Sequence, residues 1–317
     1  MWFRRLLAFF ALLVPLVLLG IAVFLVFYAW PAIHYNGLDF LWRDTWNIGN
    51  QYANPVQRHG ETVMPGAQFG ILFLVAGTLG SALIALLFAF PLGLGAALFL
   101  SEAVPHRFGH FVSFFVELLA GIPSVVFGLW GIVFLIPFLS HHVFPVLARL
   151  FHFVPFLTRP IGSGYGLLTS SLVLCLMIVP FITATLRDAL RSQSTEMREA
   201  GISLGATRFE VATRILLPGQ KTALAGATML AFGRALGEPM AVLMVSGNAL
   251  NYLPHNIYSP ISTMAAFIVA QLDSALADPT GMAVRSLAEI AVLLLVISLI
   301  TNGIARLLIG MLKEHTL

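Results

Sequence analysis

The sequence predicts an all-α polytopic membrane protein that crosses the lipid bilayer six times. Of its 317 residues, 59% are hydrophobic and only 10% are charged, a balance that excludes an ordinary soluble domain. The apolar residues gather in long segments with few charges, and each could cross a hydrocarbon layer about 30 Å thick as a helix. The six predicted spans are residues 6–30, 69–100, 111–139, 165–186, 222–245 and 284–312.

The N-terminal region, residues 1–68, is predicted to hold the first span and an external polar loop. A cleaved signal peptide is the alternative, but its apolar part would be only about 7–15 residues long and a small-residue cleavage site would follow. Residues 6–30 are longer and lack such a site, so we expect a retained helix. Aromatic residues in the loop are expected to anchor it at the membrane interface, with contact to an external protein as the alternative. They are Tyr35, Trp42, Trp46 and Tyr52.

Residues 69–312 are predicted to form a five-helix core, followed by a tail at 313–317. In the second span, Pro91, Gly93 and Gly95 predict a kink or close packing. The third span carries polar and small residues at intervals of three or four, which predicts a face turned to other helices. These residues are Ser113, Glu117, Gly121, Ser124 and Gly128. A local break is expected at Pro123, because proline frees a backbone carbonyl one turn earlier.

Two connecting segments are predicted to stay outside the spans. Residues 140–164 are expected to include a short interfacial helix, and the adjacent His141 and His142 diverge on a helix, so no metal site is expected. In the segment 246–283, residues 258–271 are too short to cross and are expected to dip into the membrane or lie flat on it.

The segment 187–221 is the longest polar interruption of the C-terminal half and is predicted to contain two short helices with a hinge. Thr195 is expected to cap the first helix, with Glu196 in its first turn. Gly205 is placed where a left-handed residue would end that helix. Thr207 and Glu210 have the spacing of a capping box, which starts the second helix.

The second helix is predicted to be amphipathic and to end at Pro218. Phe209, Ala212 and Leu216 share one face. Glu210 and Arg214 are four residues apart, in the favourable order for an ion pair. The segment is either an ordinary amphipathic loop or a rigid docking element for a soluble partner.

The spacing within this segment resembles a loop of ABC importer permeases, which reads E-A-A-x3-G-x9-I-x-L-P. The matching residues are Glu199, Ala200, Gly201, Gly205, Ile215, Leu217 and Pro218, with Gly201 in place of the second alanine. The resemblance implies a MetI-like helical bundle whose segment 195–218 docks a separate ATP-binding subunit. The only lysines, Lys221 and Lys313, do not follow a phosphate-binding glycine loop, so another chain is expected to hydrolyse the ATP. We therefore expect no cofactor, no metal and no enzymatic activity in this chain.

Several charges fall inside the predicted spans, where each needs a reason because an isolated charge is costly there. Arg234 and Glu238 are four residues apart, so they are expected to meet on one helical face. They are either a self-neutralised structural pair or part of an anion path, for which arginine offers a planar pair of donors. Arg285 and Glu289 repeat this spacing nearer an interface, where a structural pair is expected.

Two further motifs sharpen the resemblance to phosphate-specific permeases of the PstC type. Residues 233–238 with 240–242 are similar to the fifth-span signature of those permeases, and residues 121–131 are similar to their third-span motif. The resemblance continues through residues 259–261. Pro239 departs from it, because a threonine usually follows the glutamate. The resemblance implies a substrate path for inorganic phosphate that includes Arg234, Glu238, Glu117, Ser124 and Arg285.

The same resemblance implies three protein partners: the ATP-binding subunit, a second permease of the PstA type, and a periplasmic or extracellular phosphate-binding protein. Basic residues outside the spans lie mainly on the side of the N-terminus, which predicts cytoplasmic termini and a cytoplasmic docking loop in a bacterial plasma (inner) membrane. The alternatives are an ABC permease for molybdate, sulfate or phosphonate, and a channel or secondary transporter without an ATPase. No nucleic-acid partner is expected at a net charge of only +3.

Overall fold

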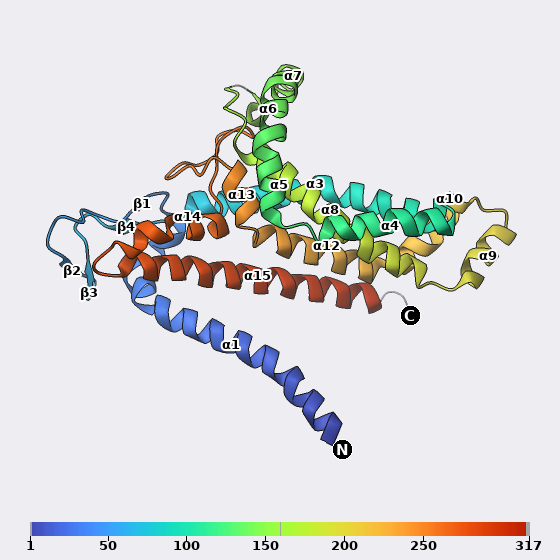
Figure 1. Ribbon diagram of the computed structural model, residues 1–317, viewed down its shortest axis with the longest axis horizontal. Helices are drawn as coiled ribbons and strands as arrows, with labels where there is room; N and C mark the ends of the chain where they lie inside the picture. The colour runs from blue at the N-terminus through green and yellow to red at the C-terminus, as the bar shows by residue number, and fades with distance from the viewer. Residues whose placement is uncertain (1, 159, 315–317) are drawn as a thin grey trace.

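The computed structural model describes residues 2–158 and 160–314, which form an elongated helical bundle (Figure 1). Helices α3 (Leu72–Leu98), α8 (Leu167–Arg191), α12 (Lys221–Leu236) and α15 (Met282–Glu314) run lengthwise and pack against one another. Small side chains at the contacts allow this approach. A Cβ atom on Gly93 of α3 would lie 2.7 Å from Ile182 Cγ2 of α8, so the predicted close packing of the second span is confirmed.

Helix α1 (Trp2–Asn36) contains the predicted first span and lies at the margin of the bundle. It packs against α15 near its C-terminal end, where Ala29 and Ala32 are buried. Its N-terminal part diverges from the bundle in Figure 1. Most of its apolar surface is therefore exposed in the isolated chain.

Five helical stretches in the described part of the chain are long and apolar enough to cross a membrane. They are Trp2–Asn36, Leu72–Ala103, Ser124–Leu150, Leu167–Arg191 and Met282–Leu307. The predicted count of six is not confirmed, because the predicted span at residues 222–245 is divided into two shorter helices; the predicted span at 111–139 is also interrupted, and its counterpart begins only at Ser124.

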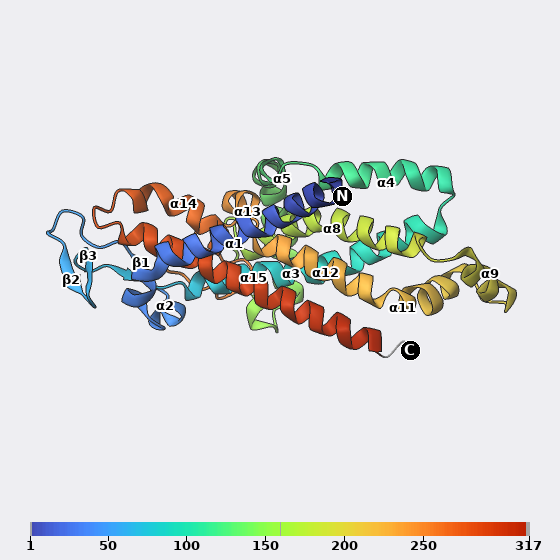
Figure 2. The ribbon, with the colours of Figure 1, turned by 90° about the horizontal axis from the view of Figure 1, so that it is seen from below.

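The first interruption divides the predicted span at residues 111–139. Helix α4 (His106–Ala120) lies along the bundle and ends before Pro123, where the predicted break is confirmed. A separate rod then begins at Ser124 and continues through α5, α6 and α7 to Leu150. Figure 1 shows this rod rising steeply from the bundle, and Figure 2 shows it nearly end-on. The expectation of a single third span is therefore wrong, because proline lacks the N–H that would continue the helix.

The segments of this rod and its neighbours have the following bounds: α5 (Ser124–Trp130), η2 (Gly131–Leu135), α6 (Ile136–Phe138), η3 (Leu139–Val143), α7 (Phe144–Leu150) and η4 (Pro155–Leu157). The expected interfacial helix within residues 140–164 is thus the end of this rod and not a separate element. The η2 and η3 segments are single π-helical turns.

The second interruption divides the predicted span at residues 222–245. Helix α12 ends at Leu236, and α13 (Met240–Val245) begins after Pro239. A segment of turns and bends follows, and its backbone bonds to the core: Ile261 N donates to Ser246 O at 2.9 Å. Such non-helical backbone is tolerated at membrane depth when protein surrounds it. Helix α14 (Met264–Leu276) follows and, at 13 residues, is too short to cross, as expected for this region.

The polar loop after α1 adds short elements that the all-α prediction missed. They are α2 (Asp39–Trp42) and two antiparallel pairs, β1 (Trp46–Asn47) with β4 (Gln68–Phe69) and β2 (Val56–Arg58) with β3 (Glu61–Val63). Trp46 is buried and its ring lies 5.0 Å from that of Phe267, so its predicted role as an interface anchor is wrong.

Candidate functional site

The predicted docking helices form a tip at one end of the bundle (Figure 1). Helix α9 (Thr195–Ser203) has Glu196 in its first turn, as expected, but Ser194 holds the capping position and makes no side-chain cap bond. The prediction that Thr195 caps this helix is therefore wrong. Gly205 has a φ of +85°, which confirms the predicted left-handed turn.

The second docking helix consists of α10 (Arg208–Glu210), η5 (Val211–Leu216) and α11 (Leu217–Gly219). The predicted capping box is confirmed: Glu210 N donates to Thr207 Oγ1 at 3.3 Å, and Thr207 N donates to Glu210 Oε2 at 2.9 Å. The hydrogen bonds that the carboxylate accepts from Thr207 N and from Thr207 Oγ1 hold the pKa of the Glu210 carboxyl below its usual range. Its ion pair with Arg214 is long, at 3.9 Å. The helix passes through Pro218 and ends one residue later than predicted, at Gly219.

Gly201 permits the two docking helices to touch. A Cβ atom there would lie 2.8 Å from Val211 Cγ2 and 2.9 Å from Ile215 Cδ1. Glycine therefore lets the two helices approach here, and the contact is tighter than an alanine would permit without movement.

Polar contacts that the sequence analysis missed fix the tip to the bundle. Arg198 of α9 forms an ion pair with Glu102, at 3.0 Å, in the π-helical segment η1 (Phe99–Ala103) that extends α3. Arg198 also donates to the carbonyl oxygen of Leu190 at 2.7 Å. Gln193 Nε2 donates to Leu216 O at 2.8 Å, which ties the second docking helix to the end of α8. No local spacing rule could have found these partners, because 96 residues separate Arg198 from Glu102.

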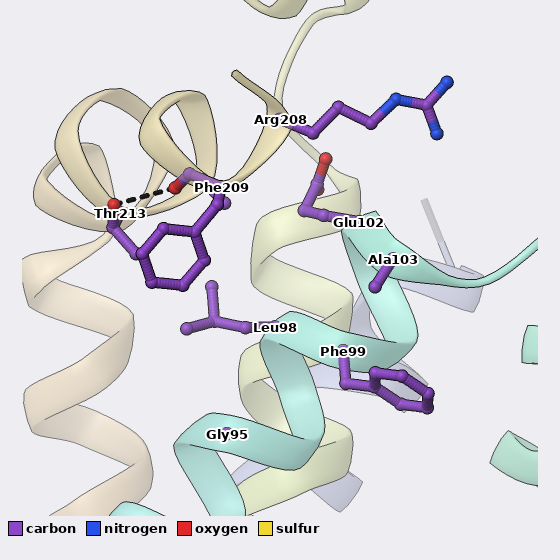
Figure 3. A pocket seen from close by; sticks show the side chains of 9 residues that line it. Gly95, Leu98, Phe99, Glu102, Ala103, Arg208, Phe209 and Thr213 are labelled. Carbon is purple, nitrogen blue, oxygen red and sulfur yellow. Dashed lines mark hydrogen bonds between the residues drawn. The ribbon is translucent and has the colours of Figure 1, made fainter. Parts of the chain in front are cut away.

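The tip exposes apolar side chains that suit a protein partner. Leu204 is 89% exposed and Phe209 is 74% exposed, and Ile202 is also on the surface. Figure 3 shows Phe209 above Leu98, at the edge of a cavity of about 460 Å³ between α3 and the second docking helix. Its polar side chains are those of Glu102, Arg208 and Thr213. Exposed apolar groups with a polar rim are typical of an interaction surface.

Some residues of the docking motif lie on that exposed surface, and the others are packed beneath it. Glu199, Ala200 and Gly205 are exposed, whereas Gly201 is buried. Ile215, Leu217 and Pro218 are partly buried. The exposed members could touch a partner directly, and the others hold the two helices together.

The predicted contact between Arg234 and Glu238 is not formed. Helix α12 ends between them, and among the described residues no ion pair involves Arg234, which is exposed. Glu238 instead accepts a hydrogen bond from Ala241 N at 3.4 Å, at the start of α13. The rule that residues four apart meet applies only while the helix continues, and Gly237 and Pro239 interrupt it.

The predicted pair of Arg285 and Glu289 is not formed either. Glu289 is buried and accepts a hydrogen bond at 2.7 Å from Asn36 Nδ2, at the end of α1. Asn36 also donates to Ser286 Oγ at 3.4 Å. Glu289 therefore joins α1 to α15, while Arg285 remains partly exposed.

Glu117 has a partner that spacing could not identify. Arg187 of α8 donates from Nη2 to Glu117 Oε1 at 2.9 Å, across 70 residues of sequence. Ser124, further along the predicted stripe, lies beyond the break, at the first position of α5. The stripe is consequently split between two elements that point in different directions.

The third-span and fifth-span motifs meet in space. A Cβ atom on Gly128 would lie 3.3 Å from Ala241 Cα of the fifth-span motif and 2.6 Å from Met244 Sδ, and one on Gly131 would lie 2.8 Å from Val245 Cγ1. These two glycines let α5 and η2 pack directly on α13. The third-span motif thus packs on the helix that follows the break. In the described part of the chain, no group of three His, Cys, Asp or Glu side chains could hold a metal ion.

Comparison with known proteins agrees with this arrangement. Residues 89–312 match the family described as the binding-protein-dependent transport system inner membrane component. The chain is 46% identical over 281 residues to the phosphate transport system permease protein PstC 1 of Mycobacterium tuberculosis, covering 88% of this chain and 83% of that protein. It is 36% identical over 310 residues to PstC of Pasteurella multocida, covering 97% and 90%.

Two solved transporters share the fold. A chain of the MetNI methionine ABC transporter in an inward-facing conformation aligns with a TM-score of 0.54 at 18% identity, covering 76% of this chain and 97% of that one. A chain of a bacterial ABC transporter involved in alginate import aligns with a TM-score of 0.51 at 22% identity, covering 74% and 78%. At these identities the likeness concerns the fold alone.

Proposed function

This chain belongs to the family of binding-protein-dependent transport system inner membrane components, and from that premise we propose that it is the PstC-type permease subunit of an ABC importer of inorganic phosphate. As a permease subunit, the chain is not itself an enzyme. The observation that carries the phosphate assignment is the 46% identity to a PstC protein along 88% of the chain. The contact between α5 and α13 supports it, because the two motifs that resemble those of phosphate permeases pack against each other there.

The tip formed by α9 to α11 docks the ATP-binding subunit. Two observations support this docking role: polar contacts attach the tip to η1 and to the end of α8, and Leu204 and Phe209 are exposed on it. ATP-driven closure of the partner would push on Glu199, Ala200 and Gly205, and the buried Gly201 contact would transmit the movement to the second docking helix. A second permease of the PstA type would complete the path, and an external phosphate-binding protein would deliver the ion.

Helices α12 and α13 together provide the crossing that is missing from the five, which is the fifth in chain order, as two short helices with a break. In the proposed topology both termini and the docking tip are cytoplasmic. A reporter at Ser192 should therefore be cytoplasmic and one at Tyr52 external. The reverse labelling would overturn both the span count and the role of the tip.

The break after α12 is the proposed centre of the anion path. Arg234 is exposed in the isolated chain and has no acidic partner among the described residues, so its guanidinium could hold an oxyanion through two parallel hydrogen bonds. Glu238 orients the start of α13 and limits how tightly the anion is held. Ser124 and Arg285 are proposed to line the same path, at the start of α5 and in the first turn of α15.

Another oxyanion is the second candidate, and Pro239 is the observation that favours it. This residue stands at the N-cap of α13, where phosphate permeases usually carry a threonine, so a hydroxyl is absent beside Glu238. Sulfate, molybdate and phosphonate have similar size and charge and would meet the same arginine.

The deciding experiment is ATP-dependent uptake into liposomes that contain this chain, the second permease and the ATPase subunit, with the binding protein outside. We expect uptake of radioactive phosphate. An excess of unlabelled phosphate should suppress it, whereas the same concentration of sulfate or molybdate should not. Uptake of sulfate or molybdate in preference to phosphate would move the assignment to the second candidate. Phosphate uptake that continues at the same rate without ATP or without the ATPase subunit would indicate a channel or a secondary transporter.

A further inference from the structure

We propose that Arg187 is a second oxyanion-binding arginine of the permeation path, and that Glu117 covers it in this conformation. The inference rests on the proposed function, because it adds a site to the same path. Arg187 lies near the end of α8 and is separated in sequence from the Arg234 motif.

The two partners differ in burial: Arg187 lies beneath and Glu117 lies on the surface above it. Glu117 therefore stands between Arg187 and solvent, and we call it the cover of this arginine. The side chain of Arg187 is only 6% exposed, whereas that of Glu117 is 57% exposed. Arg187 Nη1 is fully buried and has no hydrogen-bond partner in the described part of the chain. A buried donor without a partner is costly, so its retention points to a partner that is present in another state.

An open cavity leads to the cover. Glu117 lines a cavity of about 430 Å³ with Phe114, Leu118 and the break residues Gly121 and Pro123. Arg187 is not part of this lining, and Glu117, which accepts its hydrogen bond, lies between the arginine and the cavity at the break. An oxyanion in this cavity would meet the carboxylate of Glu117 before it could reach Arg187.

The charges explain why the site is closed. Arg187 donates to Glu117 Oε1 at 2.9 Å and to Asp188 Oδ1 at 2.6 Å, so one cation faces two carboxylates. The cluster has a formal charge of −1 and repels an anion. When Glu117 moves away, Arg187 and Asp188 are neutral together. Nη1 and the N–H of Nη2 that Glu117 releases then become a pair of donors that fits an oxyanion, while Nη2 keeps its bond to Asp188.

The docking tip has a physical connection to the helix that carries Glu117. Arg198 of α9 pairs with Glu102 of η1, and Arg191 Nη2 donates to Leu100 O, also in η1, at 2.9 Å. Only Val104 and Pro105 separate η1 from α4, which carries Glu117. A shift of the tip would therefore move α4 along α8 and change the distance between Glu117 and Arg187.

Direct binding of inorganic phosphate separates this role from a purely structural ion pair. The measurement is equilibrium binding of radioactive phosphate to the assembled complex in detergent, without nucleotide and without the external binding protein. We expect Glu117→Gln to bind phosphate at least tenfold more tightly than the wild type, because the competing charge is gone while its volume remains. In the double variant Glu117→Gln with Arg187→Gln the gain should disappear.

Asp188→Asn is the matched control, because it removes the other carboxylate of Arg187 but leaves the cover in place. We expect Asp188→Asn to increase the affinity for phosphate less than Glu117→Gln does. The proposal is overturned if Glu117→Gln binds phosphate no more tightly than the wild type, or if the gain persists without Arg187.

A second measurement applies if Glu117→Gln does not assemble. Arg187→Lys keeps a cation beside Glu117 but loses the paired donors. We expect its maximal uptake rate to fall at least tenfold per assembled complex, and an unchanged rate would overturn the proposal. Uptake of phosphate and of sulfate by the wild-type complex is measured in parallel. If the wild type carries sulfate, the proposed substrate fails, and the binding assay repeated with sulfate still decides the role of Arg187.

Discussion

Glu210 in the docking tip and Glu238 in the broken helix stand four residues from an arginine, yet they have different partners. Glu210 accepts from the backbone of Thr207 and also lies 3.9 Å from Arg214, because its helix continues from Arg208 to Gly219. Glu238 accepts from Ala241 N, and no ion pair joins it to Arg234.

The difference teaches where spacing rules are valid. In the tip, every residue that the rule uses belongs to one helix, so side chains four apart meet. In the membrane core, Gly237 and Pro239 end the helix between the two charges, and the acid bonds to the new helix instead. In the tip, Glu210 finds its partners within four residues, whereas in the core Glu117 and Glu289 pair with residues that are distant in the sequence.

The largest effect is expected from a change that separates the core elements. Gly128→Leu would place a side chain where even a Cβ atom would lie only 2.6 Å from Met244 Sδ, so α5 could not rest on α13. Overpacking of this kind typically costs about 1–3 kcal/mol. We expect a lower melting temperature in detergent and loss of most uptake. Gly20→Leu is the matched control, since a Cβ there meets nothing within 4 Å; equal damage from both variants would contradict the account.

The next effect concerns the tip and its hinge. Gly205→Val forces a β-branched residue into a left-handed conformation, which costs about 1–2 kcal/mol and misplaces the second docking helix. We expect normal membrane insertion with a several-fold loss of ATPase coupling, measured as ATP hydrolysis stimulated by the binding protein. Gly205→Asn should retain most coupling, because asparagine tolerates this conformation. Normal stimulated hydrolysis in Gly205→Val would argue against the docking assignment.

A smaller effect is expected where the tip joins the bundle. Arg198→Glu places two carboxylates together at Glu102 and should weaken coupling more than Arg198→Gln. The exchange of both charges, Arg198→Glu with Glu102→Arg, should recover part of the loss. Coupling that the exchange does not improve would show that the pair itself does not transmit the movement.

The smallest effect is expected from the cap of the second docking helix. The pKa of Glu210 is lowered by hydrogen bonds from Thr207, so its stabilisation is present above the ordinary carboxyl pKa and is lost as the pH falls through the lowered value. Hydrogen exchange of residues 207–214 should therefore lose protection at low pH. In Glu210→Gln this pH dependence should be weaker, and an identical dependence in both proteins would exclude Glu210 as its source.

The sequence predicted most of the tip and less of the core, for a physical reason. The left-handed Gly205 and the capping box of Thr207 and Glu210 depend on residues within four positions, and both are confirmed. The break at Pro123 was predicted for the same reason. The partners of Glu117 and Glu289 come from 70 and 253 residues away, and only the packing of α4 on α8 and of α1 on α15 selects them.

The central claim is that Arg234 contacts the transported anion at the break between α12 and α13. The most direct measurement is phosphate uptake by the double variant Arg234→Gln with Glu238→Gln, normalised to assembled complex. Two hydrogen bonds to a charged group are worth about 1.5–3 kcal/mol each, so the account predicts a fall of at least about 100-fold. Arg234→Lys should retain only part of the activity. Near-normal uptake in the double variant would contradict the claim and leave the two residues with a structural role.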